Sequence, residues 1–301
     1  EMCIRDSRYV RPQITNSREG RISIHDGRHP MVEHALKREM FVPNDTELNH
    51  TDQEMIIITG PNMAGKSTYM RQVAVLTIMA QTGSFIPAKS ASFAPVDRIF
   101  TRVGAADDIS TGQSTFMVEM KEVSHILCNA TKNSLILLDE IGRGTSTYDG
   151  MSIARAVVEY LNSKVHAYTL FATHYHELSD MAAENEHIKN YTVTVKERGK
   201  EITFLRRIVP GSADKSYGIH VARLAGLPES LLKRADEILE GLEVEGIKEE
   251  PAAPVIRRET ALNLFSSPII DELADLDVMS KTPIEAMEIL FRLSKEAKEG
   301  R

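Results

Sequence analysis

The stretch TGPNMAGKSTYMRQ, residues 59–72 of a 301-residue chain, joins an apolar run to a segment with helical spacing. Gly60, four further residues and then Gly65, Lys66 and Ser67 have the spacing of a phosphate-binding loop between a strand and a helix. Glycines let the backbone curl so that N–H groups point inward, and the helix start adds positive charge. The stretch therefore predicts a polyphosphate site, in which Lys66 neutralises the terminal phosphates and Ser67 ligates Mg²⁺. The full spacing argues against the alternative, an accidental glycine-rich turn.

Short β-rich runs alternate with segments of helical period along the chain, at residues 54–59, 98–103, 134–138 and 168–173. This alternation is typical of a largely parallel sheet covered by helices. Residues 191–196 and 201–209 alternate apolar and polar side chains, which predicts an antiparallel hairpin at the edge of the sheet and peripheral to the chemistry. The predicted fold class is α/β, with residues 21–225 as one domain.

Two of these runs end in polar groups that suit a nucleotide site. At the carboxyl end of the run 134–138, Asp139 would face the metal and Glu140 would orient the attacking water. The alternative is a solvated strand end. His174 follows the next run, where it would touch the γ-phosphate or the water; a metal pair with His176 is a poorer explanation because no third ligand is evident nearby.

A polar loop at residues 107–116 enters a predicted helix at 117–130. Small hydroxyls at a helix start offer a second anion-binding surface. A second anion-binding surface on the same nucleotide would crowd the phosphate-binding loop. We therefore expect a dimer in which each subunit presents its polar loop to the triphosphate bound by the other subunit. A plain helix cap is the alternative. Cys128 on this helix is interpreted as a small apolar packing residue.

Composition excludes some classes of protein. The formal net charge of −7 gives no overall electrostatic footprint for nucleic acid. The two cysteines, Cys3 and Cys128, are too few for a disulfide framework and indicate a reducing compartment. No apolar run reaches about 18 residues and residues 1–7 contain no signal core, so we expect a soluble cytoplasmic protein without a membrane partner.

The last part of the chain predicts helical appendages. A helix opening near Pro228 carries an apolar stripe, so residues 226–242 are a predicted dimerisation segment, or else dock on the main domain. Residues 243–260, with Pro251 and Pro254, indicate a linker. Residues 261–301 predict a small helical module that includes a capping box at Thr282 and Glu285. Its short helices favour packing on a partner helix over a frayed amphipathic tail.

Several long motifs now occur in order: TGPNMAGKSTYMRQ, FTRVGAADDISTGQSTFMVEM (100–120), LLDEIGRGTSTYDG (137–150) and LFATHYHEL (170–178). Together they resemble the ATPase domain of the MutS family of bacterial DNA mismatch-repair proteins, an ABC-type P-loop ATPase. The similarity runs from residue 21 through KSYGIHVARLAGLP (215–228) and resumes weakly in the C-terminal helices. It points to the C-terminal portion of such a protein.

The resemblance implies roles for individual residues, with ATP and Mg²⁺ as the bound groups. Catalytic roles fall to Lys66, Glu140 and His174, and the metal ligands are Ser67 and Asp139. Arg206 stands where some relatives have histidine, and its guanidinium would stack on the base. The loop 142–150 would cross the dimer interface. The nucleotide-binding set is Phe41, Val42, Gly60, Pro61, Asn62, Met63, Ala64, Gly65, Lys66, Ser67, Thr68, Asp139 and Arg206, with Ser114 offered in trans.

The resemblance also implies partners. These are a homodimer with composite ATP sites, a tetramer through the C-terminal helices, a MutL-type repair partner, and mismatched DNA bound through domains absent here. The family's mismatch-reading, connector, lever and clamp domains precede the ATPase domain, so residues 1–20 are expected to be a leader and a remnant of a preceding domain. The stretch ALNLF, from Ala261 to Phe265, resembles peptides that dock on the sliding clamp, although its first residue is not the usual glutamine; a hydrophobic staple is the alternative.

The resulting hypothesis is an ATP-binding and ATP-hydrolysing dimerisation domain that couples the ATP cycle to DNA-bound states of upstream domains. A nucleotide-binding subunit of a membrane transporter is a rival, but it predicts a Leu-Ser-Gly-Gly-Gln signature, and residues 110–114 read STGQS. A second rival is an assembly module without enzymatic activity.

Overall fold

The computed structural model describes residues 6–15, 20–36, 40–61, 64–104, 114–198, 201–212, 217–246, 289 and 292. The chain divides into two units, Glu1–Ile238 and Leu239–Arg301. The predicted module at 261–301 lies outside the described residues except for Ile289 and Arg292, which are helical. The clamp-like stretch from Ala261 to Phe265 is also outside them. Both stay predictions.

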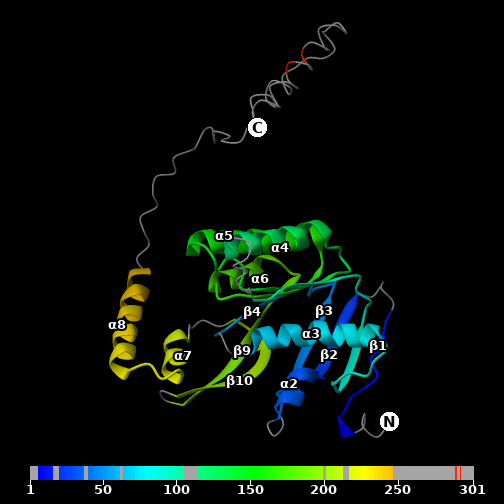
Figure 1. The fold of residues 1–301 in the computed structure, drawn as a ribbon, viewed down its shortest axis with the longest axis horizontal. Coiled ribbons are helices and arrows are strands. Elements are labelled where there is room, and N and C mark those ends of the chain that lie inside the picture. Colours follow the sequence, from blue (N-terminus) through cyan, green and yellow to red (C-terminus); the bar gives the residue numbers. More distant parts are fainter. Residues whose placement is uncertain are drawn as a thin grey trace. The chain divides into compact units, whose positions relative to one another are not determined.

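A six-stranded sheet forms the centre of the first unit, in the strand order β10-β9-β4-β8-β7-β6 (Figure 1). The pairs β9–β4, β4–β8, β8–β7 and β7–β6 are parallel, and β10 pairs with β9 antiparallel. The predicted mostly parallel sheet with an added hairpin is confirmed. The strands are β4 (Met55–Thr59), β6 (Ile99–Arg102), β7 (Leu135–Asp139), β8 (Tyr168–Ala172), β9 (Ile188–Arg198) and β10 (Glu201–Pro210).

A second, four-stranded sheet has the order β1-β5-β2-β3 and was not predicted from the sequence. Its strands are β1 (Gln13–Ile14), β2 (Arg21–Gly27), β3 (Asn44–Asn49) and β5 (Ser90–Phe93). The β1–β5 pair is parallel, and β2 pairs antiparallel with β3 and β5. Because β1 lies in this sheet, residues assigned to the predicted leader form part of the first unit.

Helix α3 (Lys66–Gln81) packs between the two sheets, and α4 (Thr115–Asn129) and α5 (Thr147–Tyr160) cover the opposite face of the larger one (Figure 1). Successive side chains of β4 point to opposite faces of the sheet, which explains this layering. Ile56 and Ile58 join the core around α3, while Met55 and Ile57 join the core around α4 and α5. Further helices within the described residues are α2 (Pro30–Ala35), a π-helix (Leu161–Val165), a 3₁₀-helix (His176–Asp180), α6 (Met181–Glu184), α7 (Gly218–Leu224) and α8 (Glu229–Gly246).

Two interpretations from the sequence need correction. Cys128 is exposed rather than packed, because a helix rotates by about 100° per residue and position 128 points away from the buried Val123 and Ile126. Helix α8 continues to Gly246, so the first residues of the predicted linker 243–260 are helical.

The apolar stripe of α8 is only partly covered among the residues whose burial the structure describes. Leu232 is buried, whereas Ile238 is 48% exposed. Self-association through residues 226–242 stays a prediction. Over the residues that the structure describes, no helix is both long and apolar enough to cross a membrane.

Candidate active site

The phosphate-binding loop follows β4 and ends at the start of α3. Gly60 and Gly65 both have positive φ, +128° and +104°, which side chains with a Cβ rarely adopt. Gly65 is the N-cap of α3, so the first amides of the helix open toward the loop. Asn62 and Met63 lie outside the described residues. The local glycine pattern thus produces the predicted turn from strand to helix.

Lys66 is 4% exposed and lies inside this bend. Its Nζ donates hydrogen bonds to the carbonyl oxygens of Gly60 and, at 3.2 Å, Pro61. Burial lowers the pKa of Lys66, while the nearby Glu140 and Asp139 oppose that shift. The loop therefore holds a cation where the sequence predicts phosphate binding.

Ser67 and Asp139 meet across the site, because Ser67 Oγ donates a hydrogen bond to Asp139 Oδ2 at 2.5 Å. Burial raises the pKa of Asp139, and the bond from Ser67 counteracts it. Mg²⁺ usually takes one or two protein oxygens together with phosphate and water, so this hydroxyl and carboxylate fit a magnesium site. Among the described residues, which include His174 and His176, no group of three or more His, Cys, Asp or Glu side chains is placed to hold a metal.

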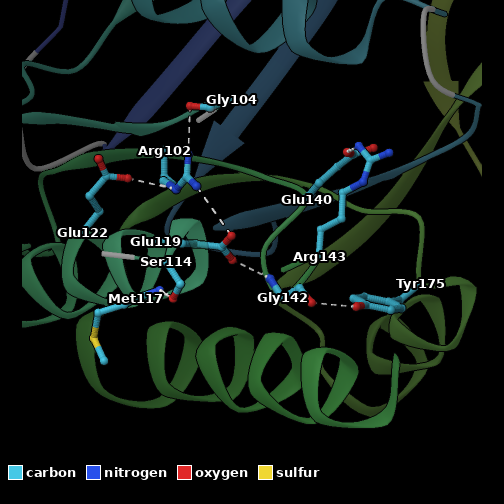
Figure 2. Close-up of polar contacts among 10 residues, drawn as sticks. All are labelled: Arg102, Gly104, Ser114, Met117, Glu119, Glu122, Glu140, Gly142, Arg143 and Tyr175. Carbon is cyan, nitrogen blue, oxygen red and sulfur yellow. Dashed lines mark hydrogen bonds and ion pairs between the residues drawn. The ribbon is translucent and has the colours of Figure 1, made fainter. Parts of the chain in front are cut away.

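Glu140 follows Asp139 at the end of β7 with an unusual backbone, φ +54°, and its N–H donates to the Ala172 carbonyl at 2.9 Å. Its carboxylate forms an ion pair with Arg143, and the two side chains lie together in Figure 2. The predicted residues at these strand ends share one cavity of 270 Å³. We call it the phosphate cavity; its lining is Pro61, Gly65, Lys66, Ser67, Thr68, Asp139, Glu140 and Arg143.

His174 lies beyond this cavity and does not line it. Its exposed ring packs against Tyr175 with 4.1 Å between ring centroids. Partial burial lowers the pKa of His174, although Glu140 acts in the opposite direction. A neutral imidazole at neutral pH would act through hydrogen bonds rather than through charge.

Ser114 is exposed and caps α4, where its Oγ accepts a hydrogen bond from Met117 N at 3.2 Å (Figure 2). The structure therefore contains the helix cap that the sequence allowed as an alternative. The cap does not exclude contact with a second subunit, but Ser114 is not in the phosphate cavity of its own chain.

A second cavity, of 90 Å³, lies on the other side of Gly65 and Thr68, and we call it the base cavity. Phe41, Val42 and Arg206, which belong to the predicted nucleotide-binding set, all line it together with Val32, Leu36, Met40, Asn44, Gly65, Thr68, Tyr69 and Gln72.

Arg206 reaches the base cavity through an irregularity in β10. The register with β9 shifts between Phe204 and Ile208, and Arg206 has φ +57°. Asn44 holds this bulge, since its amide nitrogen donates to Arg206 O at 3.1 Å and its Oδ1 accepts from Ile208 N at 2.7 Å. The hairpin is therefore not peripheral, as the sequence suggested, but forms one wall of the site.

Sequence reasoning missed several residues of the base cavity, among them Tyr69 and Gln72. Both lie on α3 and are fully or almost fully buried. Neither atom of the Gln72 side-chain amide has a hydrogen-bond partner among the residues that the structure describes. Their helical spacing from Gly65 and Thr68 was the available signal, because residues three and four apart share a helix face.

Fold and site together define the class of protein, an ABC-type P-loop ATPase domain, in which a mostly parallel sheet presents the loop and two strand-end carboxylates at one edge. Residues 56–243 match the family described as MutS domain V. The chain belongs to the MutS family.

Individual relatives support this assignment. The chain is 52% identical to the DNA mismatch repair protein MutS of Acetivibrio thermocellus, 53% to that of Methanococcoides burtonii and 56% to that of Caldicellulosiruptor bescii. These similarities cover 99%, 98% and 97% of this chain but 35% of each relative. The chain thus spans about a third of the length of the relatives that it matches.

Proposed function

We propose that this chain is the C-terminal portion of a mismatch-repair ATPase, which binds and hydrolyses ATP with Mg²⁺ and couples that cycle to DNA-bound states of domains outside this sequence. The main support is the convergence of Lys66, Ser67, Asp139 and Glu140 on one cavity. The names of the relatives support the role in mismatch repair. Because the substrate would be chromosomal DNA, we expect the protein to act in the cytoplasm.

In this proposal each group has a separate task. Lys66 and the first amides of α3 bind the β- and γ-phosphates. Ser67 and Asp139 would hold Mg²⁺, which when bound would neutralise phosphate charge. Glu140 orients the attacking water, and Arg143 keeps its carboxylate at the rim of the cavity. His174 donates or accepts a hydrogen bond as a neutral imidazole beside Glu140.

The base cavity would receive adenine. Phe41 and Val42 supply apolar contact, and the Arg206 guanidinium stacks on the ring. The buried Gln72 amide is placed to hydrogen-bond the base edge, because such a group is costly when it stays unpartnered. We also assign Asn62, Met63 and Ala64 to the nucleotide-binding set.

Two copies of the chain would form composite sites, with Ser114 of each subunit facing the triphosphate of the other. The exposure of Ser114 at the start of α4 supports this arrangement. We extend the proposal to self-association through residues 226–242 and 261–301, including a tetramer, to docking on a sliding clamp through Ala261 to Phe265, and to a MutL-type partner.

Mixing two damaged subunits tests the composite site. Ser114→Ala and Glu140→Gln should each lower ATP turnover, by roughly 10²- to 10⁴-fold for the loss of the general base. When the two variants are mixed, some dimers acquire one site with both groups intact, so phosphate release should recover in part. Glu177→Gln, a change to an exposed carboxylate, serves as the control.

Two results would count against the proposal. Equal phosphate release by wild type and Glu140→Gln would remove the catalytic assignment and favour an assembly module without enzymatic activity. Inactive mixtures of variants that still associate would show that Ser114 does not complete the site of a second subunit.

A further inference from the structure

A buried carboxylate connects helix α4 to the loop that follows β7. Glu119 is 6% exposed, and its Oε1 accepts a hydrogen bond from Gly142 N at 2.6 Å. Its Oε2 lies 3.5 Å from Nη2 of Arg102, which is equally buried (Figure 2). A carboxylate is costly to bury unless its hydrogen bonds and charge are satisfied. Glu119 therefore has a defined geometry that depends on the position of the loop.

The loop is held from its other side as well. Tyr175, buried after β8, donates its hydroxyl hydrogen bond to Gly142 O at 3.2 Å. Gly142 has φ +88°, and a Cβ at this position would lie 2.4 Å from the carbonyl oxygen of Gly150. The backbone at Gly142 is thus held by hydrogen bonds with Glu119 and Tyr175 and packs closely against the first turn of α5. We call these contacts the Gly142 clamp.

Each residue of the Gly142 clamp lies on the same helix as, or close in the chain to, a residue with a proposed role in the site. Ser114 caps the same helix that carries Glu119. Glu140 precedes Gly142 by two residues and has a positive φ of its own. His174 adjoins Tyr175 in the chain and packs against its ring. A rigid shift of α4 would consequently move Gly142, and with it the carboxylate of Glu140.

We infer that Glu119 is a positioning residue that couples the two composite sites: when Ser114 contacts the triphosphate held by a second copy, α4 sets the position of Glu140 in its own site through Gly142. The inference rests on the proposed function for the roles of Ser114 and Glu140. The physical basis is that a short charge-assisted hydrogen bond between a helix and a constrained loop transmits displacement instead of absorbing it.

Arg102 provides a matched control. It contacts two carboxylates of α4, Glu119 through Nη2 and Glu122 through Nε at 2.9 Å. Glu122 is half-exposed and makes no contact with Gly142. Glu119→Gln and Glu122→Gln therefore remove the same charge from the same ion-pair partner, but only the first alters the clamp.

The experiment measures ATP affinity, turnover against ATP concentration and thermal unfolding for both variants. Glu119→Gln should lower kcat by about ten- to a hundredfold, the scale of a small misplacement of a catalytic group, with ATP affinity unchanged. For the wild type, the curve of turnover against ATP concentration should depart from simple saturation, because the two sites of the dimer are coupled. For Glu119→Gln the same curve should follow simple saturation. Glu122→Gln should behave as wild type.

Tyr175→Phe loosens the clamp from the opposite side and decides the case if Glu119→Gln does not fold. It should lower kcat and weaken the coupling in the same direction. Wild-type kcat and curve shape in either folded variant, or a wild-type curve without coupling, overturns the inference. A wild-type chain that neither binds nor hydrolyses ATP is a different result, because it contradicts the proposed function itself.

Discussion

The phosphate cavity and the base cavity lie on either side of the start of α3, yet they are built in different ways. The phosphate cavity takes its lining residues from the loop after β4, from the first turn of α3, and from the end of β7 with the turn that follows it; six of the eight are polar or charged. The base cavity collects side chains from residues 32–44, from α3 and from a bulge in β10.

This difference affects how each cavity recognises a ligand. Charged groups and amides at a helix start recognise any polyphosphate, because they contact a feature that all nucleoside triphosphates share. Apolar walls with a few polar groups distinguish one base from another. The comparison predicts that substitutions in the phosphate cavity weaken the binding of all nucleoside triphosphates alike. The effect of substitutions in the base cavity should instead differ from one base to another.

The largest expected effect comes from Lys66→Met, which keeps most of the apolar stem and removes the buried cation. Loss of one charged partner in a buried contact costs about 2–5 kcal/mol, so ATP and GTP affinity should both fall by about thirtyfold or more. Titration with labelled nucleotides measures this. Lys121→Met on α4 is the control, and unchanged affinity in Lys66→Met would remove the phosphate-binding argument.

A smaller effect is expected for Arg206→Ala, because a guanidinium stacked on a ring contributes about 0.5–2 kcal/mol. ATP affinity should fall by about tenfold, while binding of inorganic triphosphate, which has no base, should stay unchanged. The neighbouring Arg207→Ala, outside the lining of the base cavity, is the control. If the affinities for ATP and for inorganic triphosphate fell equally, Arg206 would contact the phosphates, and the two cavities would not differ in the way proposed.

The smallest effect on binding is expected for Gln72→Leu. Because the amide is proposed to contact adenine, its removal should lower ATP affinity by a few-fold, as the loss of a neutral hydrogen bond implies. The variant should also discriminate less against GTP. The same change should raise the unfolding temperature, because it removes a buried amide without partners.

Gln81→Leu on the same helix is the matched control, since the Gln81 side-chain amide bonds both backbone groups of Val96. That variant should lose stability and keep nucleotide selectivity. A stabilised Gln72→Leu with unaltered selectivity would mean that the amide takes no part in binding.

Much of the fold followed from local patterns. Apolar runs bounded by turn residues predicted β4, β7 and β8, because a strand buried on both faces needs such a run. The edge strand β6, which is only partly buried, was predicted as a β-rich run. The small sheet escaped prediction, since β1 and β5 are short and β2 pairs with strands distant in the chain. Cys128 was misassigned because nearness in sequence to Val123 and Ile126 does not mean a shared helix face.

By itself, the sequence predicted that Lys66, Ser67, Asp139 and Glu140 meet, because two glycines at a fixed spacing, a following lysine and carboxylates at a strand end act through local geometry. It also placed His174 with them, although that residue does not line the phosphate cavity. The resemblance to a family supplied Phe41, Val42 and Arg206. Only the tertiary structure decided how Arg206 reaches α3, that Gln72 is buried without partners, and that Glu119 holds Gly142. These contacts join segments far apart in the chain, and a bulge or a buried hydrogen bond between such segments depends on packing that no local pattern records.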